Sequence, residues 1–213
     1  MAAVEVILVL VVVTNLKLLG SSRLGASIRG VAMQGVLLGL LPLLAHAETL
    51  SARYVALAVG TMAVKGLVFP WLLFRAVREA EVTREVEPYV GYVASLLVGV
   101  AALGASFWMG TRLPVPEAVA SPSLVPVAMF SILSGLFLIV SRKRALSQVL
   151  GFLVLENGVF TFGVGVMAET PLLVEVGVLL DVFVAVFVMG ITIFHINREF
   201  DHIDTDRLSA LKD

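Results

Sequence analysis

The stretch YVALAVGTMAVKGLVFPWLLF, residues 54–74, decides the fold class of this chain. A run of about 20 mostly apolar residues is long enough to cross a hydrocarbon core of about 30 Å as a helix. Two later stretches have the same character, VLGFLVLENGVFTFGVGVM at 149–167 and LLVEVGVLLDVFVAVFVMGI at 172–191. All three carry an ionisable residue near the middle, namely Lys65, Glu156 and Asp181. A charge at such depth costs about 2.5 to 3.5 kcal/mol, so these residues are candidates for a function in proton or ion movement.

Similar apolar runs recur along the whole chain. Of its 213 residues, 59% are hydrophobic and only 15% are charged, and the mean hydropathy is +1.02. This composition predicts an all-α polytopic membrane protein with no soluble domain. We predict a bundle of seven transmembrane helices, at about 3–19, 28–46, 52–74, 89–111, 122–140, 147–168 and 172–196.

The basic residues predict the orientation of this bundle. Only Arg53 and Arg112 flank the spans on one side, and Lys65 lies inside a span. The positive-inside rule places the opposite, basic side in the cytoplasm, so we expect the N-terminus outside and the C-terminal tail inside. The other twelve basic residues share that cytoplasmic side: Lys17, Arg23, Arg29, Arg75, Arg78, Arg84, Arg142, Lys143, Arg144, Arg198, Arg207 and Lys212.

A proline-containing stretch divides the chain. TRLPVPEAVASPS, residues 111–123, holds three prolines and must end the helices on both sides. We therefore predict a four-helix membrane half at 1–112, a linker at 113–121, and a three-helix half with a short cytoplasmic tail at 122–213. No internal repeat relates the two halves.

Composition and spacing argue against several function classes. The formal net charge is −1, which gives no basic footprint for nucleic acid. Cysteine is absent, and the three histidines (His46, His195 and His202) lack metal-ligand spacing. No nucleophile with a base and no phosphate-binding glycine loop is present. We expect a non-enzymatic membrane protein without a cofactor or metal.

Glu156 and Asp181 are the candidate proton carriers. Glu156 lies about ten residues, or about 15 Å, from either end of its span, which is too far for its side chain to reach water. Asn157 and Thr161 add polar groups beside it. Asp181 lies equally deep in the last span. The alternative for both acids is a protonated carboxyl that only fixes helix pairing.

Lys65 is the candidate charge partner of these acids. Pro70 follows it in the same span and cannot donate to the carbonyl of Gly66, so we expect a kink or an opened turn beside the lysine. Breaks of this kind line polar cavities in membrane proteins. The alternative is a lysine that neutralises an acid purely for assembly. Gln34, in the second span, is expected to bond a neighbouring helix.

The C-terminal part resembles a known family of membrane subunits. SRKRALSQVLGFLVLENG, and then LLDVFVAVFVMGITIFHINREFDHIDTDRLSALKD, are similar to the smallest, three-helix (K-type) subunit of respiratory NADH dehydrogenase and to the C subunit of multi-subunit cation/proton antiporters. The resemblance places Asp181 at that family's second buried acid. Gly151 and Asn157 match its preceding helix, but Leu153 stands where the family has glutamate, and Glu156 lies one turn later on the same face.

The whole chain, with AVKGLVFPWL in the third span and DTDRLSALKD in the tail, resembles component E of hydrogenase-4. That resemblance implies a multi-pass subunit of the cell membrane in a complex I-related energy-converting hydrogenase. Its partners would be a hydrogenase-anchoring membrane subunit and antiporter-like subunits. Glu156 and Asp181 would relay protons there, and Lys65 would modulate them. A subunit of a cation/proton antiporter and a non-transporting scaffold are the alternatives.

Overall fold

The computed structural model describes residues 2–45, 52–79, 88–113 and 121–166, together with the single residues Val184, Val188 and Gly190. Every element in these ranges is a helix. In chain order they are α1 (Ala2–Leu19), α2 (Leu24–Ala45), α3 (Ala52–Ala63), the π-helix η2 (Val64–Val68), α4 (Phe69–Glu79), α5 (Tyr92–Gly110), α6 (Leu124–Ser141) and α7 (Ala145–Val166).

Six helices in the described part of the chain are long and apolar enough to cross a membrane. They cover Ala2–Leu19, Leu24–Leu44, Ala58–Arg78, Tyr92–Gly110, Leu124–Ser141 and Ala145–Val164. These segments confirm an all-helical, multi-pass membrane protein and correspond to the first six predicted spans. The predicted seventh span, 172–196, lies outside the described residues apart from Val184, Val188 and Gly190.

Two predicted boundaries were wrong. The second helix begins at Leu24 and not near residue 28. Arg29 is accommodated inside its first turns, where its Nε atom donates to the carbonyl of Gly25 at 3.1 Å. The third span continues through α4 to Glu79, where the predicted span ended at residue 74. Its last turns carry arginines on a face that is exposed at Arg75 and Arg78.

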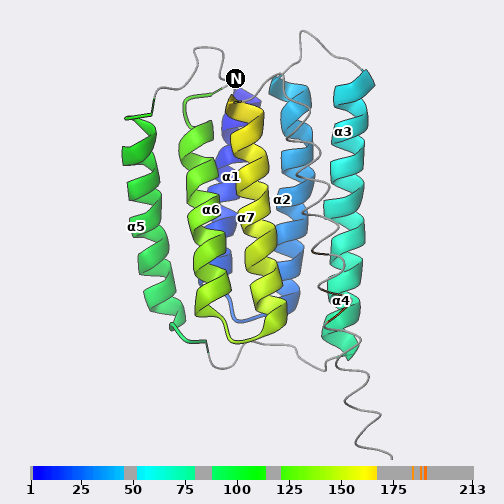
Figure 1. Cartoon of the computed structure of the whole chain (residues 1–213), viewed down its shortest axis with the longest axis vertical. Coiled ribbons are helices and arrows are strands. Elements are labelled where there is room, and N and C mark those ends of the chain that lie inside the picture. The colour runs from blue at the N-terminus through cyan, green and yellow to red at the C-terminus, as the bar shows by residue number, and fades with distance from the viewer. Residues whose placement is uncertain are drawn as a thin grey trace, which may run out of the picture.

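The helices form one upright bundle (Figure 1). In this view α1, α6 and α7 are central, while α5 and the α3–α4 rod occupy opposite edges. Burial agrees with the picture, since 61% of the span in α6 is buried but only 17% of that in α5. The outer faces are apolar, with Val93 77% and Leu67 72% exposed, as expected of helices that face lipid.

Glycines bring the backbones of α6 and α7 into contact. A Cβ atom added to Gly135 would lie 2.6 Å from the carbonyl oxygen of Gly151. One added to Gly158 would lie 2.7 Å from the amide nitrogen of Ile132. Small residues allow this approach, which supplies van der Waals contact where lipid gives no hydrophobic driving force. The close packing of α6 against α7 fixes the position of the α7 face that carries Glu156.

Two hydrophobic clusters fill the two ends of the bundle. The smaller packs the first half of α1 and α6 against the second half of α2, and includes Leu8, Leu38 and Val127. The larger packs the opposite ends of the same helices with α4 and α7, and includes Leu19, Leu73 and Leu150; Val184 and Val188 also belong to it. Between the two clusters lies a layer of buried polar side chains: Asn15, Gln34, Lys65, Ser131, Glu156 and Asn157. This layer is the candidate functional site.

Candidate functional site

A buried ion pair joins Lys65 and Glu156. The Nζ atom of Lys65 lies 2.5 Å from Oε1 of Glu156, and the two side chains are only 7% and 2% exposed. Both charges are almost completely buried, so each depends on the other and on nearby hydrogen bonds for stabilisation. The Nζ atom also lies 5.5 Å from the centroid of the Phe160 ring, one turn along α7, within the range of a cation–π contact.

The wide turn η2 positions Lys65. The N–H of Phe69 donates to the carbonyl of Val64, a π-helical bond, and Pro70 has no N–H to offer the preceding turn. Helix α2 is in close contact here, because a Cβ atom on Gly35 would lie only 2.5 Å from Cβ of Lys65. The turn therefore presses the base of the lysine against α2, while its ammonium extends to α7.

Asn157 is the second partner of the lysine. Its Oδ1 atom accepts a hydrogen bond from Lys65 Nζ at 3.2 Å, and its Nδ2 atom donates to Oε1 of Gln34 at 3.4 Å. All three side chains are buried. Asn157 thus links the ion pair to helix α2.

Gln34 continues the polar layer into α1 and α6. Its Nε2 atom donates to Oδ1 of Asn15 at 2.7 Å and to the carbonyl of Val11 at 3.3 Å. The Nδ2 atom of Asn15 donates to Oγ of Ser131 at 2.8 Å, and the Ser131 hydroxyl donates to the carbonyl of Val127 at 3.0 Å. A continuous hydrogen-bonded path therefore crosses the bundle from the ion pair to α6.

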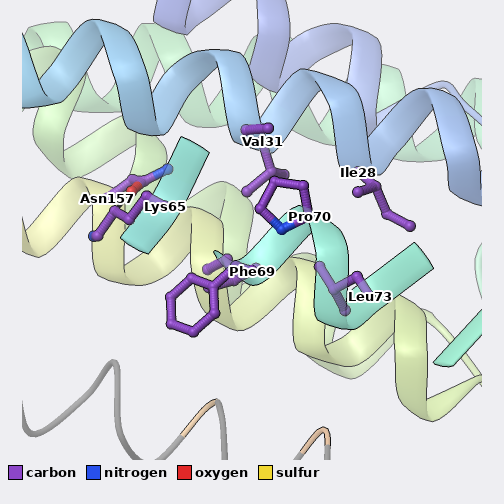
Figure 2. Close-up of a pocket in the computed structure, with 9 residues that line it drawn as sticks. Ile28, Val31, Lys65, Phe69, Pro70, Leu73 and Asn157 are labelled. Atoms are coloured by element: carbon purple, nitrogen blue, oxygen red, sulfur yellow. Dashed lines mark hydrogen bonds between the residues drawn. The ribbon is translucent and has the colours of Figure 1, made fainter. Parts of the chain in front are cut away.

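A small cavity adjoins the ion pair on the side of the larger cluster. It holds about 10 Å³ of water-sized space, about enough for one water molecule. Figure 2 shows Lys65 and Asn157 at one end of this cavity, Ile28 and Leu73 at the other, and Pro70 between them. Residues of α2, η2, α4 and α7 line it.

The structure assembles part of the site that the sequence indicates. Lys65, Glu156, Asn157 and Gln34 lie in one connected group. Thr161 is buried but donates to the carbonyl of Asn157 on its own helix, at 2.7 Å. Pro70 lines the cavity next to Lys65. Asp181 lies outside the described residues.

Sequence reasoning missed Asn15 and Ser131. Asn15 lies close to the end of its predicted span, where an amide is ordinarily solvated, and serines are common in membrane helices. A usable signal was the presence of amides in two consecutive spans, at Asn15 and Gln34, since buried amides need hydrogen-bond partners and can supply them to each other.

Arg142 lies between α6 and α7, in the basic segment where the sequence places it, but its side chain is buried. It is 2% exposed, and its Nη2 atom donates to the carbonyl of Leu19 at 2.6 Å. Its guanidinium lies 4.8 Å from the Tyr92 ring centroid. The arginine thus caps the end of α1, where the helix leaves carbonyls without partners.

Within the described ranges, no group of three or more His, Cys, Asp or Glu residues is placed to hold a metal ion.

Comparison with known proteins gives a family. The uncharacterised protein Rv0085 of Mycobacterium tuberculosis is 36% identical over 191 residues, which cover 89% of this chain and 87% of that protein. The chain belongs to the Rv0085 family. A match of this length takes in the segments of both Lys65 and Glu156.

A shorter similarity carries a functional name. Hydrogenase-4 component E of Escherichia coli K12 is 34% identical over 98 residues, or 46% of this chain and 45% of that protein, and the Shigella flexneri protein gives the same figures. No protein-family model matches the chain, and no solved structure matches it. The similarity to a hydrogenase-4 component thus covers about half of this Rv0085-family chain.

Proposed function

We propose that this chain is an integral subunit of a complex I-like, energy-converting membrane complex of the hydrogenase-4 type. It contributes buried charges to a proton or ion path, while partner subunits carry out the redox chemistry. The observation that carries the proposal is the Lys65–Glu156 pair, held between two hydrophobic clusters at the middle of the bundle. The similarity to hydrogenase-4 component E supports the type of complex.

The pair has properties that a charge-transfer step needs. Two opposite unit charges about 4 Å apart attract by about 4 kcal/mol at an effective dielectric of about 20. A proton that arrives on Glu156 removes this attraction, and the lysine then carries an uncompensated charge. Proton occupancy at the acid is therefore coupled to the charge balance around Lys65.

The protein is proposed to lie in the cell membrane with seven helices. Its N-terminus would be outside and its C-terminal tail in the cytoplasm. The distribution of basic residues supports this topology. Asp181, near the middle of the seventh predicted span, is the proposed second acid of the path. The chain itself is proposed to have no enzymatic activity and to bind no cofactor.

The partners are proposed to be antiporter-like membrane subunits and a hydrogenase-anchoring membrane subunit. Purification of the native complex through an affinity tag on this chain, followed by mass spectrometry, tests this. Recovery of a [NiFe] large subunit with antiporter-like subunits supports the proposal. Recovery of antiporter subunits without a redox subunit favours the cation/proton antiporter, and recovery of the chain alone contradicts both.

A further inference from the structure

Among the described residues, the hydrogen bonds that connect Lys65 to Ser131 all run in one direction. The ammonium donates to Asn157, Asn157 donates to Gln34, Gln34 donates to Asn15, and Asn15 donates to Ser131. Each amide presents its oxygen toward the lysine and its nitrogen away from it. The dipoles of three amides are therefore aligned so that their negative ends face the positive charge.

Both ends of this series of hydrogen bonds are fixed by groups that cannot switch between donor and acceptor. An ammonium can only donate, and the backbone carbonyls of Val11 and Val127 can only accept. The carbonyl of Val11 accepts from Nε2 of Gln34, and the carbonyl of Val127 accepts from the hydroxyl of Ser131. A flip of any single amide would place two donors or two acceptors face to face, so the whole network determines each orientation.

We propose that Gln34 and Asn15 are positioning residues for Lys65. They hold the amide of Asn157 with its oxygen toward the ammonium, and the aligned amides stabilise the positive charge from a distance. Lys65 therefore has two partners: Glu156, which loses its negative charge on protonation, and Asn157, a neutral amide that does not titrate.

This arrangement deepens the proposed function, because it keeps the lysine in place when Glu156 takes up a proton. Its use in ion transfer rests on the proposed function, but the orientation of Lys65 by the amides can be tested without any transport assay. The chain has four lysines, Lys17, Lys65, Lys143 and Lys212, so Nζ-labelled lysine gives few signals.

The experiment is solid-state NMR of ¹⁵Nζ-lysine in the full-length protein in lipid bilayers. The Lys65 signal is assigned by its loss in Lys65→Met. Asn15→Leu removes the amide but keeps a similar volume, and Ser131→Ala is a milder change that leaves Asn15 without its acceptor. Thr14→Val is the matched control, since buried Thr14 donates only to Leu10 of its own helix among the described residues, at 2.6 Å.

We expect Asn15→Leu and Ser131→Ala to shift the Lys65 signal, the second less than the first, and Thr14→Val to leave it in place. If Asn15→Leu does not fold, the comparison of Ser131→Ala with Thr14→Val decides the question. An unchanged Lys65 signal in the folded variants would overturn the proposal. An equal shift in Thr14→Val would overturn it too, because the effect would then be a general disturbance of α1. Since no ion movement is measured, neither result depends on whether the protein transports ions.

Discussion

The ammonium of Lys65 and the carboxylate of Glu156 lie 2.5 Å apart, buried between two hydrophobic clusters. A buried pair of this kind contributes little net stability, because desolvation offsets most of the attraction. Loss of one member alone is costly, since the other charge stays buried. Each member of the pair therefore depends on the other for charge compensation.

The first prediction concerns this mutual dependence. Lys65→Met and Glu156→Gln should each lower the free energy of unfolding by about 3–5 kcal/mol, because each leaves an uncompensated buried charge. The double variant should be less destabilised than the sum of the single variants, because no charge remains. Thermal unfolding of the purified protein in mild detergent measures the cycle. Strict additivity would mean that the two side chains do not form a pair in the membrane.

The second prediction concerns the contact between α2 and the wide turn. Gly35→Ala should destabilise the protein by about 1–3 kcal/mol, because the added Cβ atom would lie 2.5 Å from Cβ of Lys65 and would force α2 away from η2. Gly60→Ala is the matched control, since no atom lies within 4 Å of its added Cβ and alanine favours helix by about 0.5–1 kcal/mol. Equal melting temperatures for the two variants would refute the close approach.

The third prediction concerns Pro70. Alanine at this position restores an N–H donor, which favours an α-helical turn over the π-helical turn at Val64–Val68. Loss of the wide turn would rotate Lys65 relative to α4 by about 100°, one residue of a helix with 3.6 residues per turn. We expect the coupling energy between Lys65 and Glu156 to fall in the Pro70→Ala background. A coupling energy equal to that of the wild type would show that the proline does not maintain the turn.

Much of the fold was predictable from the sequence, because lipid imposes simple requirements. Length and apolarity located the six described spans, since a span must satisfy its own backbone and face lipid. Charge at depth singled out Lys65 and Glu156 for the same reason: an ionisable residue is too costly to keep there without a use. The sequence could not show which acid pairs with Lys65, because the pairing depends on how α7 is rotated against α2 and η2.

The remainder of the site follows from packing that has no local signal. Gly135, Gly151 and Gly158 bring α6 and α7 together and so fix the face that carries Glu156. Ser131 and Asn15 meet only because α1 and α6 are neighbours, although they are far apart in sequence. Similarly, Arg142 follows a helix end in a basic run, which indicates exposure, yet the neighbouring end of α1 buries it.

Proton translocation by the assembled complex is the decisive measurement for the proposed role of Glu156. Glu156→Gln keeps size and hydrogen-bonding capacity but cannot carry a titrating proton, so translocation in membrane vesicles should drop while the redox activity of partner subunits persists in detergent. Asp181→Asn should lower translocation as Glu156→Gln does, and the control Thr14→Val should pump at the wild-type rate. We expect loss of translocation in an assembled, redox-active Glu156→Gln complex. Assembly and pumping at the wild-type rate would contradict it and leave the Lys65–Glu156 pair as a structural contact.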